Sequence, residues 1–187
     1  MGKFYRVLAD PKAVNRWHLK APVTACGIEI DPRNFTSGTF YTGETSLDLQ
    51  LRRLGQPVDF NFCDFDMLVV KREINSNLER NFGDAIQRIP VRIQNFQEEF
   101  EILNVLNVVD CIDEVKSEYL KWEPQDGRPE KIGAYRMMTK LVIDPEKAKG
   151  HSIFRLDGWK IAVIVSDEIK KYLENRSVSG IVFQQVT

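Results

Sequence analysis

Apolar and polar residues follow a regular pattern from about residue 66 onward. Met67–Val70 is wholly apolar, which predicts a short buried strand. Lys71–Asn81 then places Ile74 and Leu78 four residues apart, as on one face of a helix. Ile89–Ile93 returns to a strand pattern, and its proline predicts a sheet edge or a strand start. The segment therefore predicts a strand–helix–strand unit.

The last thirty-five residues predict a second unit of this kind. Ile161–Val165 is an apolar run that predicts a strand, and Ser166 can cap a following helix because its hydroxyl accepts from a free backbone N–H. Asp167 and Glu168 favour the N-terminus of that helix. Ile181–Phe183 predicts the closing strand.

The two units correspond at an offset of about 95 residues, which suggests an internal structural repeat. The alternative is that both units look alike because the same periodicities govern every strand and helix. The offset superimposes Val69-Val70 on Ile164-Val165, Ile74 on Ile169 and Leu78 on Leu173.

The remaining segments predict mostly strands and loops. Lys3–Leu8, Leu47–Arg52, Tyr135–Ile143 and His151–Leu156 read as strands, Trp122–Pro129 as a loop, and Asp144–Lys147 as one helical turn. Glu101–Asp110 fits a strand or a helix face, and its β-branched residues favour a strand. We predict an α+β fold, with a mixed, largely antiparallel sheet and a few short helices packed on it. It forms a single domain over residues 1–187, in which residues 1–57 are a less regular, strand-rich N-terminal portion.

Composition narrows the class of protein. Lys and Arg number 26 and Asp and Glu 27, so the net charge of −1 argues against a nucleic-acid binder. No apolar run approaches the roughly 18 residues of a membrane span, and the apolar stretch in Met1–Leu8 is too short for a secretory signal. Three scattered cysteines predict neither disulfides nor a zinc site. We expect an unanchored cytoplasmic protein.

Residues that would support catalysis are sparse. His151-Ser152 with Asp157 nearby contains the residue types of a hydrolytic triad, but no G-x-S-x-G sequence surrounds the serine. Asp64-Phe65-Asp66 resembles a carboxylate pair that holds a divalent ion, yet no Gly-rich phosphate loop lies nearby. We therefore predict no catalytic residue, no cofactor and no metal site.

Acidic and aromatic residues beside the central apolar run suggest a binding surface instead. Local acidity speeds the capture of a cationic protein, and Trp and Tyr often anchor interfaces. A solvated face that aids solubility is the alternative for each residue taken singly. The predicted interface comprises Asp110, Asp113, Glu114, Glu118, Tyr119 and Trp122.

Several short stretches of the chain form a recognisable set of motifs: Asp59-Phe60, Leu68–Val70, Leu103–Val105, Val109–Asp113, Ser117-Glu118, Ile153–Leu156, Ile164–Glu168 and Ser179–Phe183. These stretches resemble a bacterial family of polymorphic-toxin immunity proteins, immunity-protein family eleven. The resemblance covers roughly residues 58–187, although Lys71 stands where the family often has Ser.

The resemblance implies a cytoplasmic antitoxin that binds the cognate toxin domain of a bacterial effector and occludes its active site. It implies no catalytic residues, no nucleic-acid partner and no membrane association. Two other functions stay open from the residues alone: a small cytoplasmic enzyme (a hydrolase or a metal-dependent transferase) and an adaptor module of a secretion system.

Overall fold

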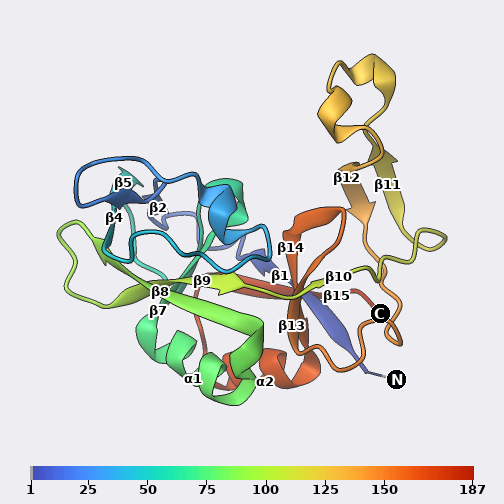
Figure 1. Ribbon diagram of the computed structural model, residues 1–187. Helices are drawn as coiled ribbons and strands as arrows, with labels where there is room; N and C mark the ends of the chain where they lie inside the picture. Colours follow the sequence, from blue (N-terminus) through green and yellow to red (C-terminus); the bar gives the residue numbers. More distant parts are fainter. Residues whose placement is uncertain (1) are drawn as a thin grey trace.

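Two β-sheets form the body of the molecule in the computed structural model, which describes residues 2–187 (Figure 1). The first has six strands in the order β3-β4-β8-β9-β7-β6. Only the β4–β8 pair is parallel. Its strands are β3 (Val23–Thr24), β4 (Leu47–Leu49), β6 (Phe60–Phe62), β7 (Leu68–Lys71), β8 (Ile86–Ile93) and β9 (Phe100–Val105).

The second sheet has five strands in the order β10-β13-β14-β1-β15. Only the β10–β13 pair is parallel. Its strands are β1 (Phe4–Ala9), β10 (Val108–Val109), β13 (Ile153–Leu156), β14 (Trp159–Ser166) and β15 (Ile181–Gln185). With helices packed on mostly antiparallel sheets, the fold is α+β, as predicted from the sequence.

Two helices, α1 (Arg72–Phe82) and α2 (Asp167–Asn175), lie side by side beneath the sheets in Figure 1. Each buries the apolar residues expected from its four-residue spacing, Ile74 and Leu78 in α1 and Ile169 and Leu173 in α2. One hydrophobic cluster contains all four together with residues of both sheets. The hydrophobic effect therefore joins the two sheets through a shared core.

The 95-residue correspondence holds in the structure. Arg72 and Asp167 begin the two helices, and Ile86 and Ile181 begin the strands that follow them, so both pairs are 95 residues apart. The Oγ of Ser166 caps α2 by accepting from the backbone N–H of Ile169 at 3.4 Å. β7-α1-β8 and β14-α2-β15 are therefore equivalent strand–helix–strand units.

Each unit is completed by a third strand that runs antiparallel to both of its neighbours. β9 lies between β7 and β8, and it follows them in the chain. β1 lies between β14 and β15, although it comes from the opposite end of the sequence. The first strand of the chain thus fills the position that β9 fills in the other sheet.

The N-terminal portion contributes mostly short elements after β1. The predicted strand Leu47–Arg52 is two strands, β4 and β5 (Leu51–Arg53), because each pairs with a different partner. β5 pairs with β2 (His18–Leu19). A 3-10 turn, η1 (Pro32–Phe35), lies between β3 and β4, and a second one, η2 (Asp64–Asp66), follows β6 outside this portion. This portion covers the outer face of the six-stranded sheet through a second cluster that includes Trp17 and Phe35.

Other predictions were refined. The prediction of strand rather than helix within Glu101–Asp110 is confirmed by β9 and β10. Pro90 lies where β8 pairs with β9 alone, just before pairing with β4 begins, so its missing N–H costs no ladder bond. The single helical turn predicted at Asp144–Lys147 is present, because the backbone N–H of Ala148 donates to the carbonyl of Asp144 at 3.2 Å; residues 145–150 form hydrogen-bonded turns and no longer helix. No helix within residues 2–187 is both long and apolar enough to cross a membrane.

Candidate functional site

A two-stranded hairpin projects from the body of the protein beside the five-stranded sheet (Figure 1). We call residues 113–140 the arm. It consists of β11 (Glu118–Lys121) and β12 (Tyr135–Lys140), joined by a tip that contains two 3-10 turns, η4 (Pro124–Asp126) and η5 (Pro129–Lys131). Within residues 2–187, neither outer edge of this hairpin pairs with another strand.

The root of the arm is fixed to the core. The Oγ of Ser117 donates to the carbonyl of Val142 and accepts from its backbone N–H, both at 3.0 Å. Met138 on β12 is buried in a hydrophobic cluster that also contains Ile143, Cys111 and residues of the five-stranded sheet. A projecting hairpin anchored in this way has a defined direction.

One face of the arm is a hydrogen-bonded cluster around Glu114. Its carboxylate accepts from the Nζ of Lys121 at 2.6 Å and from the hydroxyls of Tyr119 and Tyr135. Hydrogen bonds from Lys121, Tyr135 and Tyr119 lower the pKa of Glu114 to about 2. The two tyrosine rings meet edge to face with centroids 5.1 Å apart. This face is thereby ordered, and its carboxylate is paired.

The opposite face of the arm is apolar and open to solvent. Leu120 and Met137 lie directly across from each other on the two strands, and their side chains are 54% and 47% exposed. Ile132 near the tip is 51% exposed, and Val115 at the root is 95% exposed. Exposed apolar side chains that gather on one element mark binding surfaces more often than scattered ones do.

The structure places the six residues of the predicted interface on or beside the arm, but not on one face. Glu114 and Tyr119 lie on the hydrogen-bonded face, whereas Glu118 precedes Leu120 by two residues in β11 and lies on the apolar face. Trp122 stands at the neck of the tip, with the Nζ of Lys131 5.2 Å from its ring centroid.

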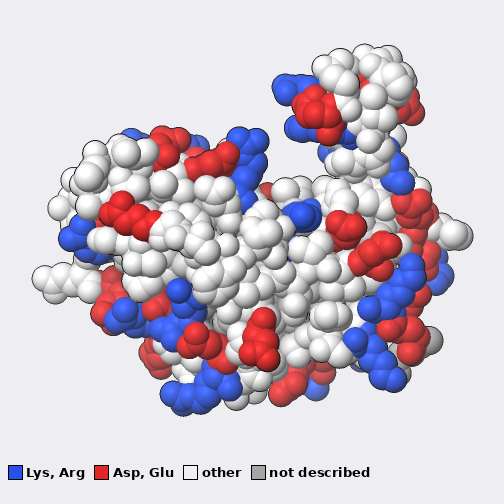
Figure 2. All heavy atoms as spheres, in the orientation of Figure 1, with Lys and Arg blue, Asp and Glu red and all other residues white. Residues whose placement is uncertain are grey.

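The two remaining members lie at the root. Asp110 is exposed, while Asp113 pairs with the Nζ of Lys116 at 2.7 Å. Two of the four acidic members, Asp113 and Glu114, therefore have a lysine partner within the arm. Figure 2 shows both signs of charge on the tip.

The exposed apolar pair, Leu120 and Met137, was not predicted from the sequence. Met137 lies in the predicted strand Tyr135–Ile143, where an apolar side chain usually faces a core, and Leu120 lies outside every predicted element. One signal in the sequence could have identified Leu120. Its neighbours Tyr119 and Lys121 point to the opposite face of the short strand, so Leu120 is left on the other face. The tertiary structure exposes both members of the pair because nothing covers that side of the hairpin within residues 2–187.

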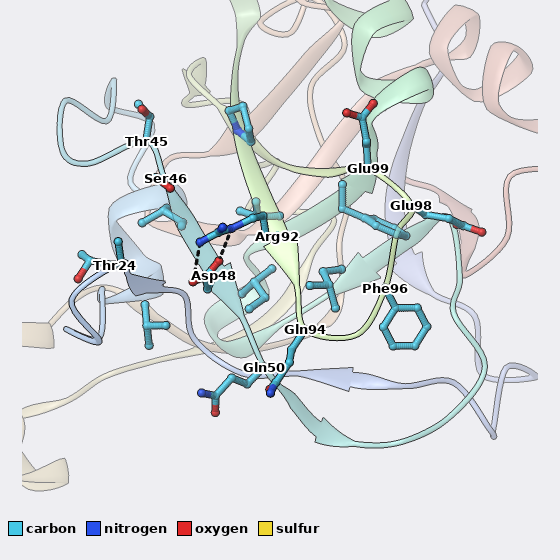
Figure 3. Close-up of a pocket in the computed structure, with 18 of the residues that line it drawn as sticks. Thr24, Thr45, Ser46, Asp48, Gln50, Arg92, Gln94, Phe96, Glu98 and Glu99 are labelled. Atoms are coloured by element: carbon cyan, nitrogen blue, oxygen red, sulfur yellow. Dashed lines mark hydrogen bonds and ion pairs between the residues drawn. The ribbon is translucent and has the colours of Figure 1, made fainter.

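A groove of about 890 Å³ lies across β3, β4 and the end of β8 (Figure 3). Arg92 and Asp48 form a two-pronged ion pair on its floor, at 2.8 and 3.1 Å. Glu98 and Glu99 lie at the other end and point away from that pair; they bind Lys71 and Arg72. The carboxylates that line this groove all have basic partners, which distinguishes it from a site with a free acid or base.

The residues considered for catalysis do not assemble into a reacting set. Between His151, Ser152 and Asp157 there is no side-chain hydrogen bond in the part of the chain that the structure describes. Asp64 is held by Arg52, and Asp66 lies beside Arg6 and Arg155. No group of three His, Cys, Asp or Glu side chains within residues 2–187 is arranged to hold a metal ion.

Comparison with known sequences gives one positive result. No curated protein matches the chain. The family model described as Immunity protein family (Imm11) matches residues 29–187, so the match begins upstream of the residues 58–187 over which the resemblance was recognised. Because this match spans most of the sequence, the protein belongs to the Imm11 immunity protein family.

Proposed function

We propose that the protein is an antitoxin that acts in the cytoplasm. It binds the toxic domain of a cognate polymorphic or contact-delivered effector, and the arm covers or enters the active site of that toxin. Family membership supports the class of function. The observation that carries the mechanism is the projecting hairpin, with a fixed root and an uncovered apolar face.

The shape of the arm fits a concave partner. Enzyme active sites are usually clefts lined largely by apolar side chains, with a few polar groups. A hairpin that stands clear of its own body can reach into such a cleft, whereas a flat sheet face cannot (Figure 2). Leu120 and Met137 would be buried there, and Glu118 and Trp122 would lie beside them.

The arm also offers two routes to affinity. Its apolar face can bury aliphatic area, and its unpaired strand edges can add to a sheet of the partner through main-chain hydrogen bonds. A stable complex needs about 1,600 Å² of total buried surface. The arm therefore acts together with neighbouring surface at its root, where Asp110 and Asp113 lie.

Co-expression with the toxic domain encoded beside this gene tests the proposal. The wild-type protein should restore growth and should co-purify with the toxic domain. The double variant Leu120→Asp, Met137→Asp places two charges on the apolar face, and it should weaken binding by at least 100-fold and abolish protection.

A matched control separates a specific effect from a general one. Leu54→Asp changes a leucine that is 80% exposed in the N-terminal portion, and it should leave binding and protection intact. Because the altered side chains are exposed, both variants should unfold at wild-type urea concentrations. The arm mechanism fails if the arm variant still protects, and the antitoxin function fails if the wild-type protein neither protects nor binds.

An enzymatic alternative makes a different prediction. If the protein acted as a hydrolase through His151 and Ser152, the variants His151→Ala and Ser152→Ala would lose protection. We expect both variants to protect fully, because no hydrogen bond joins these side chains within residues 2–187. An adaptor role would be indicated by a partner that is not toxic on its own.

A further inference from the structure

A cavity of about 490 Å³ lies where the two main sheets meet. One wall comes from β1, β14 and the loop after β1, and it includes Arg6 and Arg16. The other wall comes from the six-stranded sheet and includes Phe62 on β6 and Asp66 in η2. The charged side chains that line the cavity are thus two arginines and one aspartate; we call it the junction pocket.

Guanidinium nitrogens at this junction lack hydrogen-bond partners. The Nε of Arg6 and the Nη1 of Arg16 are buried and unpaired within residues 2–187. Arg155 is fully buried beside Asp66, and its Nε is also unpaired. Buried donors nearly always have a partner, so three such groups in one region call for an explanation.

The positive charge at the junction exceeds the negative charge. The other nitrogens of Arg155 donate to two backbone carbonyls, those of Lys160 at 2.6 Å and Asp66 at 3.2 Å, so they neutralise no carboxylate. Arg6 stacks over the ring of Trp159 at 4.6 Å from its centroid, and burial lowers its pKa. Asp66 is the one carboxylate that acts on both Arg6 and Arg155.

The backbone beside the pocket is strained. Phe65 and Asp66 have φ angles of 54° and 56°, a left-handed backbone conformation that residues other than glycine seldom adopt. Two successive residues of this kind persist only where surrounding structure holds them, and such positions are concentrated at ligand sites. Here the strain brings the Asp66 carbonyl to the Nη2 of Arg155.

We propose that the junction pocket binds a small oxyanion, a phosphate or a carboxylate group, between Arg6 and Arg16. The planar guanidinium group presents N–H donors in a geometry that matches both kinds of anion. A bound oxyanion would accept from the guanidinium N–H groups of Arg6 and Arg16 that line the pocket, and it would balance the excess positive charge. This site is separate from the arm.

Titration of the purified full-length protein with inorganic phosphate, at low ionic strength and with chloride as the reference anion, tests the site. Calorimetry should show one phosphate per chain, and the Nε–Hε signals of Arg6 should shift in NMR spectra. Arg6→Gln and Arg16→Gln should each weaken phosphate binding about tenfold or more. Asp66→Asn should strengthen it, because it removes a competing negative charge.

Arg128→Gln, which alters an exposed arginine at the tip of the arm, is the matched control and should bind phosphate like the wild type. If Arg6→Gln fails to fold, Arg16→Gln still answers the question, because Arg16 lies in the loop after β1. The proposal is overturned if the wild type binds no phosphate, or if both glutamine variants bind it unchanged.

Acetate then distinguishes the source of the oxyanion. If the site serves an acidic side chain of a protein partner, acetate should compete with phosphate, and Arg6→Gln should weaken capture of the toxic domain. If the site serves a free phosphate group, acetate should compete only at much higher concentrations than phosphate, and capture should be unchanged in Arg6→Gln. Loss of protection without loss of phosphate binding would concern the antitoxin proposal alone.

Discussion

Glu101 in the six-stranded sheet and Tyr5 in the five-stranded sheet occupy equivalent positions with different chemistry. Val70 and Pro90 flank Glu101 on the neighbouring strands, and the residues 95 positions further along flank Tyr5. Both side chains lie at the contact between the central strand and the helix of their unit. The comparison therefore shows which side-chain features this backbone arrangement requires at the position and which can differ between the two units.

Glu101 is the centre of a buried ion cluster. Its side chain is 1% exposed and accepts from both Nε and Nη2 of Arg88, at 2.7 and 2.8 Å. The Nε of Arg72 at 3.0 Å and the Nδ2 of Asn75 at 3.1 Å complete the set of donors. A buried carboxylate is tolerated here because several donors offset its desolvation.

Tyr5 is surrounded by the residues that correspond to these partners. Asp167, Lys170 and Phe183 lie 95 positions after Arg72, Asn75 and Arg88. The hydroxyl of Tyr5 donates to Asp167 at 3.3 Å, and the Nζ of Lys170 lies 5.1 Å from the ring centroid of Tyr5. An aromatic ring with a nearby cation thus replaces the ion cluster.

The difference teaches that the two units share their apolar positions and not their polar ones. Ile74 and Leu78 in α1 match Ile169 and Leu173 in α2, and all four are buried. The position between helix and strand accepts any group whose polar atoms find partners. The ion cluster should fail as a whole when its carboxylate is removed, whereas the aromatic arrangement should weaken only in part.

Removal of β1 should have the largest effect on stability, because it deletes the central strand of one unit and leaves the central strand of the other unit in place. A chain that begins at residue 10 loses the central strand between β14 and β15, together with the buried side chains of Phe4, Tyr5 and Val7. The loss should match most of a typical domain stability of about 5–15 kcal/mol. Circular dichroism with urea should show no cooperative unfolding of the five-stranded sheet.

A synthetic peptide of residues 1–9, added to the shortened chain, should restore part of the structure. Unchanged cooperative unfolding of the shortened chain would show that β1 contributes little to the free energy of unfolding, despite its equivalence with β9.

Glu101→Gln should be the most costly single change among the equivalent positions. It leaves Arg88 and Arg72 facing a neutral amide in a buried site, which should reduce the free energy of unfolding by about 3 kcal/mol. Urea unfolding at pH 7 measures this loss. If the loss is no larger than that of a Tyr5 variant, the ion cluster is not the stabilising feature that its geometry indicates.

The same position should make stability depend on pH. Desolvation raises the pKa of Glu101, but hydrogen bonds from Arg88 and Arg72 outweigh it and leave the pKa below its ordinary value. The stabilisation is therefore present above the unfolded pKa of about 4.3 and is lost as pH falls through the folded pKa. The difference in unfolding free energy between wild type and Glu101→Gln should shrink from pH 7 to pH 3. A difference that stays constant would contradict this.

Tyr5→Phe should have the smallest effect. It removes one hydrogen bond of 3.3 Å, and Asp167 keeps its ion pair with Lys171 at 2.6 Å. The ring and its contact with Lys170 remain, so the loss should be below about 1 kcal/mol. A urea midpoint close to that of the wild type would support the expectation that the aromatic arrangement weakens only in part, and a large shift would refute it.

Sequence patterns located the regular elements well and the binding surface only in part. Four-residue spacing placed both helices, and Ser166 marked the start of α2. The segment Leu47–Arg52 alternates evenly, yet it divides into two strands because its halves meet different neighbours. Tyr119 and Trp122 were proposed as interface residues because they lie beside acidic residues in the sequence, whereas Leu120 and Met137 became candidates only through their exposure in the structure.

The sequence by itself determined most of the local elements, because periodicity encodes which side of a strand or helix is buried. Its motifs indicated the family, and its 95-residue offset suggested the correspondence that the structure confirms. Only the tertiary structure decided that β1 fills in one sheet the position that β9 fills in the other, that a hairpin stands clear of the body, and that Arg6, Arg16 and Asp66 line one pocket. The reason is that periodicity states whether a face is covered but not by which segment. Pairing between strands as distant as β1 and β14 depends on contacts that no local pattern contains.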